Sequence, residues 1–279
     1  MEIAISVRMA IFAGGRLKAK EHLKVVATKK PIKIGNVEIG GKKVLICIPI
    51  TATTFEELEL QLNNIYNAKP DLIEWRADYF SGLNPSSLIS VLRRLKTDMP
   101  ETPLIFTLRD WAEGGYRFLE LSERFELVTC AIKSSLIDLL DIELNLERGL
   151  QKNILTEAVD FGVFSILSFH DFNHTPKRGV MRDKLLSMQD FGANIAKIAV
   201  TPVNAADVLE LWHAVLEAKS AGLSIPVIGI SMGFIGIPSR IVGGFFGSDI
   251  VFAAGDSPSA PGQIPFQTMR RLIDLIETL

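Results

Sequence analysis

The sequence predicts an α/β protein, a (β/α)8 barrel that follows an N-terminal β-hairpin. Short apolar runs alternate with helical stretches eight times over about 235 residues, which is the number and size of such a barrel. Several of the runs end in ionisable residues. This is expected of buried parallel strands whose carboxyl ends meet at one mouth, where the chemistry takes place.

The expected elements follow one another from residue 32 onward. Two short alternating runs, Ile32 to Ile34 and Val37 to Ile39, flank Gly35-Asn36 and predict the hairpin. Eight strands are then expected to begin near Val44, Leu72, Leu104, Ile137, Val163, Ile195, Val227 and Ile250. The helices between them are expected over 54–67, 85–96, 118–133, 146–161, 178–191, 205–220, 238–246 and 265–278.

A doubly wound sheet is the main alternative to the barrel. A nucleotide-binding version of that fold would place a glycine-rich phosphate loop after a strand, and the chain has neither a G-x-G-x-x-G in that context nor a Walker loop. We therefore expect one barrel domain over residues 31–279, preceded by an N-terminal extension over residues 1–30. Arg8 interrupts the apolar stretch of this extension, which argues against a secretory signal. A weak targeting sequence or an alternative start at Met9 remain open.

Composition narrows the possible partners and compartment. The 30 basic and 32 acidic residues nearly balance, so nothing indicates a surface for nucleic acid or an anionic membrane. Mean hydropathy is high, at +0.26, yet no apolar run approaches the length that crosses a bilayer. Cys47 and Cys130 lack metal-ligand spacing, and their small number favours a reducing cytoplasm.

Lys197 lies inside the apolar run from Ala193 to Val200. Alternation along a strand gives it the same face as Ile195 and Ala199, so it points into the barrel mouth if those residues line the interior. In apolar surroundings a lysine loses hydration, which favours its neutral, nucleophilic form. The alternative is a strand-end lysine whose ammonium group reaches water.

His170 is the one histidine of four that a predicted strand delivers, and it is the natural general acid–base. A hydrogen-bonded core histidine is the alternative. Glu113 follows Arg109 in a loop that turns at Gly114 and Gly115. It can accept a hydrogen bond from His170 and fix the tautomer of the ring, although Glu113 taken alone is more simply a solvated loop carboxylate.

Further charged residues stand near strand ends. Arg109 can clamp a carboxylate or a hydroxyl group. The sets Glu74, Arg76, Asp78 and Asp141, Glu143 alternate along their strands, and each can be a structural ion pair or a binder of several hydroxyls. Arg240 follows a glycine-containing loop near an expected helix N-terminus, a position that favours an anion. Ser259 to Gln263 form a polar loop above the barrel or an ordinary turn.

Six motifs occur in order from about Ile32 to the C-terminus: Glu74-Trp-Arg76, Arg109 with Glu113-Gly-Gly, Ser168-Phe-His-Asp171, the isolated Lys197, Ser231-Met-Gly-x-x-Gly-x-x-Ser-Arg240, and Ser259-Ala-Pro-Gly-Gln263. Together they resemble type I 3-dehydroquinate dehydratase. The resemblance implies loss of water from 3-dehydroquinate to give 3-dehydroshikimate, a reaction of the shikimate pathway and aromatic amino-acid biosynthesis. It also implies a homodimer that needs no metal or organic cofactor.

By matching position, the resemblance implies that Lys197 forms an imine with the substrate ketone. It implies that His170 is the general acid and base, that Glu113 holds this histidine, and that Arg240 is the main partner of the substrate carboxylate. The other substrate contacts that it implies are Glu74, Arg76, Arg109, Ser259 and Gln263, with apolar walls from Phe172, Met232, Phe252 and Ala260.

Two positions depart from the family pattern: Asp110 stands where a threonine is common, and Pro49 where some members have a serine. A different Schiff-base barrel enzyme, such as a class I aldolase, is the second hypothesis, but it would commonly want a phosphate site after strands seven and eight. The His170–Glu113 pair with Gln263 favours the dehydratase. A barrel that only binds or scaffolds is the third hypothesis, and it predicts no imine.

Overall fold

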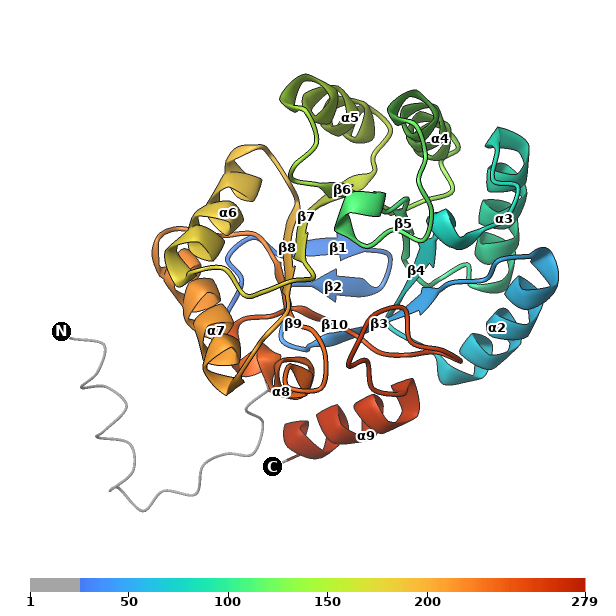
Figure 1. The fold of residues 1–279 in the computed structure, drawn as a ribbon. Coiled ribbons are helices and arrows are strands. Elements are labelled where there is room, and N and C mark those ends of the chain that lie inside the picture. Colours follow the sequence, from blue (N-terminus) through green and yellow to red (C-terminus); the bar gives the residue numbers. More distant parts are fainter. Residues whose placement is uncertain (1–25, 279) are drawn as a thin grey trace, which may run out of the picture.

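The structure, a computed structural model, describes residues 26–278. Eight parallel strands form a nearly closed barrel inside a ring of helices (Figure 1). The strands are β3 (Leu45–Ile50), β4 (Leu72–Arg76), β5 (Leu104–Thr107), β6 (Leu139–Glu143), β7 (Phe164–Asp171), β8 (Ile195–Val200), β9 (Val227–Ser231) and β10 (Ile250–Phe252). They pair in chain order, with β10 beside β3. Between β9 and β10, the backbone N–H of Asp249 donates to the carbonyl of Val227 at 2.6 Å. The predicted barrel is confirmed.

The helices of the described chain are α2 (Phe55–Ala68), α3 (Pro85–Asp98), α4 (Leu121–Lys133), α5 (Arg148–Asp160), α6 (Arg178–Asp190), α7 (Ala205–Ser220), α8 (Ile237–Ile241) and α9 (Phe266–Glu277). Short 3-10 helices are η1 (Ala77–Tyr79), η2 (Trp111–Glu113) and η3 (Gly243–Phe246). The single helix expected over 238–246 is wrong in extent. It divides at Val242 into α8 and η3, and η3 begins with Gly243 and Gly244, two successive residues of low α-helix propensity.

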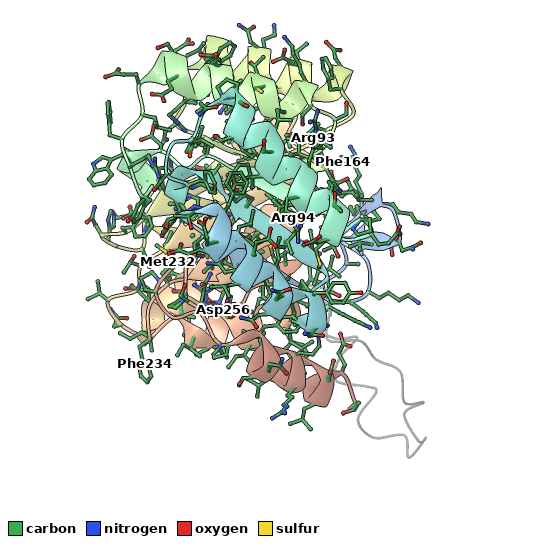
Figure 2. The ribbon with its side chains drawn as sticks, turned by 90° about the vertical axis from the view of Figure 1, so that its right-hand side faces the viewer. Arg93, Arg94, Phe164, Met232, Phe234 and Asp256 are labelled. Atoms are coloured by element: carbon green, nitrogen blue, oxygen red, sulfur yellow. The ribbon has the colours of Figure 1, made fainter. Side chains whose placement is uncertain are left out.

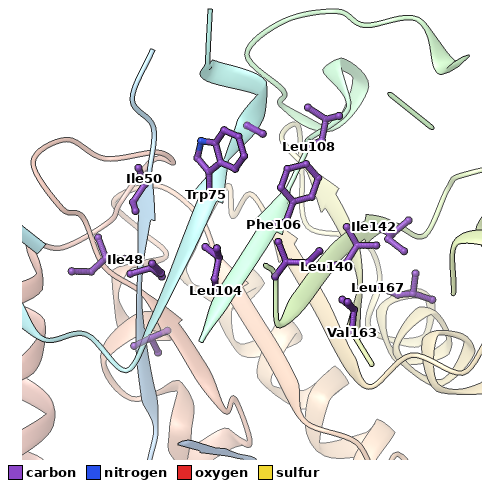
Figure 3. Close-up of a cluster of buried hydrophobic side chains, with 14 of the residues drawn as sticks. Ile48, Ile50, Trp75, Leu104, Phe106, Leu108, Leu140, Ile142, Val163 and Leu167 are labelled. Atoms are coloured by element: carbon purple, nitrogen blue, oxygen red, sulfur yellow. The ribbon is translucent and has the colours of Figure 1, made fainter. Parts of the chain in front are cut away.

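Strand alternation sorts the apolar residues into two layers. One face of each strand packs against the helices, as Ile48, Trp75, Phe106 and Leu140 do in Figure 3. The other face fills the lower barrel interior with the side chains of Leu45, Cys47, Leu72, Ile105, Leu139, Ile166, Ile195, Ile228 and Ile250. Both faces are apolar at this level, and this explains why the strands are continuously hydrophobic in sequence.

The predicted hairpin is confirmed as β1 (Ile32–Ile34) and β2 (Val37–Ile39), which pair antiparallel. Ile39 is fully buried against the lower interior, and Ile32, Ile34 and Val37 pack on the same cluster. The hairpin therefore covers the amino-terminal end of the barrel. In Figure 2 it lies at the right of the molecule, whereas Met232 and Phe234 lie at the left.

Residues 1–25 lie outside the described residues, so the extension predicted over 1–30 stays a prediction. Its last residues contact the barrel: the backbone N–H of Lys30 donates to the carbonyl of Ser224 at 2.9 Å, and the Thr28 hydroxyl donates to Asp249 at 3.1 Å. Across residues 26–278, no helix has the length and apolar character that spanning a membrane requires.

Candidate active site

A polar layer lies directly above the apolar floor of the barrel. Two residues beyond Leu72, Ile105, Leu139, Ile166 and Ile195, the strands carry Glu74, Thr107, Asp141, Ser168 and Lys197. Because side chains alternate with a period of two, these five residues point into the interior like the floor residues below them. Parallel register sets Thr107 beside Asp141 and Ser168 beside Lys197.

The layer opens into a cavity at the carboxyl ends of the strands. All of the predicted site residues line it: Glu74, Arg76, Arg109, Glu113, His170, Phe172, Lys197, Met232, Arg240, Ser259 and Gln263, together with Phe252 and Ala260. The structure thus brings together residues from strands β4, β7, β8 and β10, from helix α8, and from the segments that follow β5, β7, β9 and β10.

Lys197 is 5% exposed and lies at the base of the cavity. Its Nζ donates to Asp141 Oδ2 at 2.7 Å and lies 3.7 Å from Glu74 Oε1 and 4.7 Å from the ring centre of Phe252. The expected apolar surroundings are therefore wrong for the amine itself. The charged groups that contact the amine are carboxylates. Asp141 on β6 and Glu74 on β4 point into the interior at the same level as Lys197 on β8.

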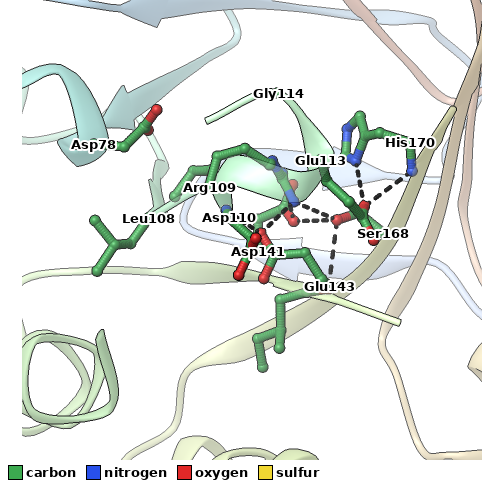
Figure 4. Close-up of polar contacts among 12 residues, drawn as sticks. Asp78, Leu108, Arg109, Asp110, Glu113, Gly114, Asp141, Glu143, Ser168 and His170 are labelled. Atoms are coloured by element: carbon green, nitrogen blue, oxygen red, sulfur yellow. Dashed lines mark hydrogen bonds and ion pairs between the residues drawn. The ribbon is translucent and has the colours of Figure 1, made fainter. Parts of the chain in front are cut away.

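His170 and Glu113 form the predicted pair. Glu113 Oε2 lies 3.1 Å from His170 Nδ1 and accepts the backbone N–H of His170 at 3.0 Å (Figure 4). Asn145 donates to Glu113 Oε1 at 2.9 Å. Glu113 is only 6% exposed, so the interpretation of this residue as a solvated carboxylate is wrong. With Glu113 ionised, Nδ1–H donates to it and Nε2 is left as a proton acceptor.

Burial governs the charge state of this pair. It raises the pKa of Glu113 to about 7, against the opposing charge of Arg109. Burial, with the positive charges of Arg109 and Lys197, lowers the pKa of His170 well below its usual value. The imidazole is accordingly neutral near pH 7, which is the state that a general base requires.

Arg109 is held by acidic neighbours. Its guanidinium contacts Asp141 Oδ1 at 2.8 Å and Glu143 Oε1 at 2.9 Å, and it donates to Ser168 Oγ at 2.9 Å (Figure 4). Although burial raises the pKa of Asp141, the charges of Arg109 and Lys197 lower it far below its ordinary value. Asp141 is therefore an anion that bridges the lysine and the arginine.

The acidic and basic residues of β4 do not pair with each other. Arg76 makes two hydrogen bonds to Asp78, at 2.8 and 2.7 Å, whereas Glu74 accepts from the Thr107 hydroxyl at 2.8 Å. Asp78 is not on the strand as the alternation suggested, because the chain turns into η1 after Arg76. Asp78 also accepts the backbone N–H of Tyr116, so it joins this strand end to the loop that carries Glu113.

Arg240 is 2% exposed, and its guanidinium is only partly bonded. Nη1 donates to the carbonyl of Phe252 at 3.2 Å and Nη2 to that of Pro261 at 3.1 Å, but Nε has no partner. Burial lowers the pKa of this side chain to about 10. The expected helix N-terminus is wrong, since α8 has five residues and Arg240 lies in its last turn. Arg240 therefore brings the charge of its guanidinium, rather than a helix N-terminus, to the wall of the cavity.

The remaining walls are built by two loops. Gln263 Nε2 donates to Ser259 Oγ at 3.0 Å, and Gln263 Oε1 accepts the backbone N–H of Ser259 at 2.7 Å. Phe172 packs over Gly114, where a Cβ would come within 2.3 Å of the phenyl ring. Only glycine permits this contact, and Gly114 also has φ of +82°. The Gly-Gly turn after Glu113 therefore lets the aromatic wall close over it.

Four residues that contact predicted site residues were not assigned to the site from the sequence: Asp141, Glu143, Ser168 and Asn145. The alternation of Asp141 with Glu143 gave a signal for inward carboxylates, but not for the contact of Asp141 with Lys197. Asn145 carried no signal. Among residues 26–278, no group of three or more histidine, cysteine or acidic side chains is arranged to hold a metal ion.

Comparisons with known proteins agree with this geometry. A family model for type I 3-dehydroquinase matches residues 46–279. A protein of Geobacillus sp. (strain WCH70) is 35% identical over 252 residues, which are 90% of this chain and 96% of that protein. It is named 3-dehydroquinate dehydratase, that is, a hydro-lyase.

Two solved structures are similarly close. The type I 3-dehydroquinate dehydratase of Clostridium difficile, solved with covalently modified comenic acid, has a TM-score of 0.86 and 34% identity and covers 89% of this chain and 98% of its own. The 3-dehydroquinate dehydratase of Geobacillus kaustophilus HTA426 has a TM-score of 0.86 and 33% identity, with coverage of 90% and 98%. The chain belongs to the type I 3-dehydroquinase family.

Proposed function

We propose that this protein removes water from 3-dehydroquinate to give 3-dehydroshikimate, through an imine that Lys197 forms with the substrate ketone. The observation that carries the proposal is the position of Lys197. A buried amine projects into a cavity that also holds a neutral imidazole and an incompletely bonded arginine. Family membership gives the substrate class.

In this mechanism the neutral amine of Lys197 attacks the carbonyl carbon C3, and loss of water from the addition product leaves an iminium ion. The positive nitrogen withdraws electrons from the neighbouring C2–H bond, so this proton becomes removable. Lys197 loses one ammonium proton before it attacks, and the addition product takes up one proton as its hydroxyl leaves as water, so the net proton count of the step is zero. The pairing with Asp141 keeps the amine in place at the base of the cavity.

His170 then takes the C2 proton at Nε2 and returns it to the C1 hydroxyl, which leaves as water. Glu113 holds Nδ1 at 3.1 Å and so keeps Nε2 free for both transfers. The lone pair of the intermediate enamine re-forms the iminium as the C1–O bond breaks. Water finally hydrolyses the product iminium and regenerates Lys197.

A polyhydroxylated acid needs an anion clamp and several hydroxyl partners. The buried guanidinium of Arg240, which lines the cavity, supplies the clamp for the carboxylate, and Glu74, Arg76, Arg109, Ser259 and Gln263 supply polar groups around the same cavity. Met232 and Phe172 supply apolar walls. We expect the protein to act without a metal or organic cofactor, as a homodimer in the cytoplasm.

Trapping of the imine tests the proposal. The protein is incubated with 3-dehydroquinate and borohydride, digested, and searched by mass spectrometry for a reduced adduct on Lys197. We expect the adduct in the wild type, with dehydration measured in parallel. Lys197→Ala is expected to lose both while its circular dichroism is unchanged. A near-normal rate in Lys197→Ala, or an absent adduct together with absent dehydration in the wild type, contradicts the proposal.

A different Schiff-base enzyme, such as a class I aldolase, would share Lys197. The guanidinium of Arg240 at the cavity wall would serve a phosphate as well as a carboxylate. The same trapping experiment with a phosphorylated ketose separates the two. An adduct with the ketose and none with 3-dehydroquinate would favour the aldolase.

A further inference from the structure

We propose that Asp141 is a positioning residue that sets the plane of the iminium on Lys197, so that one C2–H bond stands perpendicular to that plane and faces His170. This inference rests on the imine proposed above. It assigns a role in the deprotonation step to a carboxylate that does not itself exchange a proton with the substrate.

The carboxylate of Asp141 is fixed from three directions. Oδ2 accepts from Lys197 Nζ at 2.7 Å, while Oδ1 contacts Arg109 Nη2 at 2.8 Å and accepts from the Ser168 hydroxyl at 2.6 Å. The side chain is fully buried. Three donors around one planar group leave it no second orientation, so the direction of its bond to the lysine nitrogen is determined by the barrel.

That direction matters more after the imine has formed than before. An ammonium group has three N–H bonds and can turn without losing its partner. An iminium nitrogen is planar and keeps a single N–H, which lies in the plane of the C=N bond. Asp141 Oδ2 lies 2.7 Å from Nζ, against 3.7 Å for Glu74 Oε1, so it is the acceptor for this one N–H. The hydrogen bond therefore selects the plane.

The geometry of the C–H bond then decides the rate. The C2–H bond breaks, its proton goes to His170 Nε2, its electron pair forms the C2=C3 bond, and the C=N pair moves onto nitrogen. This transfer requires the C2–H bond to overlap the π system, so it must stand perpendicular to the iminium plane. A misplacement of about 1 Å in such an arrangement can cost about 100-fold in rate.

The charge of Asp141 alone does not explain a role for this carboxylate in the deprotonation step. An anion beside the nitrogen stabilises the ammonium and the iminium alike, so it gives no net drive toward the imine. It also favours the iminium over the neutral enamine and thus opposes deprotonation. Arg109, bonded directly to Asp141, offsets that charge. Orientation is the contribution that remains.

The test compares Asp141→Asn with Glu143→Gln. Asparagine has nearly the same shape as aspartate, but it places an amide group where the carboxylate oxygens contact Lys197 and Arg109. Glu143 is a matched control because it is a buried carboxylate that also contacts Arg109, at 2.9 Å, and has no contact with Lys197. For each variant we measure kcat, KM, the borohydride-trapped adduct, and the isotope effect with substrate deuterated at C2.

Asp141→Asn is expected to form the adduct on Lys197 while kcat falls about 100-fold, KM changes little, and the isotope effect rises as deprotonation becomes limiting. Glu143→Gln is expected to lose less activity and to keep the wild-type isotope effect. If Asp141→Asn fails to fold by circular dichroism, Ser168→Ala removes one donor that aims the carboxylate. It is then expected to raise the isotope effect in the same way.

Three outcomes overturn the inference. A kcat of Asp141→Asn within about threefold of wild type removes any role. Loss of the adduct in step with the rate assigns Asp141 to capture of the ketone instead. Equal isotope effects in Asp141→Asn and Glu143→Gln make its role that of general charge balance. If the wild type forms no adduct, the imine proposal itself is wrong. This outcome is distinct from the other three because it is seen before any variant is made.

Discussion

Asp110 and Arg124 form an ion pair, with Nη1 and Oδ2 separated by 2.5 Å, that ties the loop carrying Glu113 to helix α4. Arg124 Nη2 also contacts Glu143 Oε2 at 2.9 Å, and the backbone N–H of Asp110 donates to Glu143 Oε1 at 2.9 Å. The departure from the common threonine at position 110 thus comes with a basic partner on α4. We infer that this pair supports the position of Glu113.

A double-mutant cycle tests this support. Asp110→Asn is expected to cost only about 0.5–1 kcal/mol of unfolding free energy, since Asp110 is partly exposed. Arg124→Gln leaves Glu143 without one of its cationic partners and is expected to cost about 3 kcal/mol. The two costs should be non-additive by about 1 kcal/mol in urea unfolding, whereas simple addition would contradict coupling through the pair.

His170→Ala is expected to lower kcat by about two to four powers of ten, because it removes the group that we propose transfers both protons. The borohydride adduct on Lys197 should still form, since ketone capture does not need the imidazole. Stopped-flow rates and mass spectrometry of the trapped protein measure the two effects. An unchanged rate would identify another base.

The raised pKa of Glu113 predicts how kcat changes on the acidic side of its pH profile. Burial raises its pKa to about 7, so it takes up a proton as the pH falls through that value and no longer holds His170 Nδ1 as an anion. We expect kcat to decline below about pH 7. Glu113→Gln should have a lower plateau and no such decline. A decline that persists in this variant would belong to another group.

The same pKa has a consequence for stability. Between 4.5, the ordinary value, and about 7, the folded protein binds a proton at Glu113 that the unfolded chain releases. The contribution of Glu113 to the unfolding free energy therefore falls as the pH rises through this window. Since the pKa of His170 is lowered, its contribution runs the other way. Urea unfolding of Glu113→Gln relative to wild type should show the variant gaining relative stability from pH 4.5 to 7, and a constant difference would refute this.

Arg240→Gln is expected to raise KM by about 10- to 100-fold with a smaller change in kcat, because it removes the guanidinium at the cavity wall that we assign to the substrate carboxylate. Arg270→Gln is the control. Arg270 pairs with Asp71 outside the cavity, so its loss should leave both constants unchanged. Steady-state kinetics suffice, and a KM of Arg240→Gln equal to that of the wild type would exclude the assignment.

Much of the fold and the site was predictable because alternation fixes which face a strand residue occupies. Lys197 faces inward with Ile195 and Ala199, as the pattern of apolar residues required. The partner of an inward residue is a different matter, since it depends on the register of neighbouring strands. Nothing local to Lys197 shows that Asp141, 56 residues away in sequence, is its partner.

Loops were less predictable for the same reason. The burial of Glu113 results from Gly114 and Phe172, which come from different strand–helix units and meet only in the folded barrel. The turn of the chain into η1 after Arg76 changes the direction of Asp78, and no strand pattern contains that information. Local periodicity gives elements and faces, whereas contacts between loops require the assembled structure.

In the described part of the chain, the hairpin β1–β2 closes the amino-terminal end of the barrel. Reactant and dehydrated product must consequently pass through the same opening, one after the other. A product molecule that remains bound would block binding of the next substrate molecule. Inhibition by accumulated product should therefore be relieved by raising the substrate concentration. Late in a reaction, the turnover rate then depends on how quickly the product leaves through this shared opening.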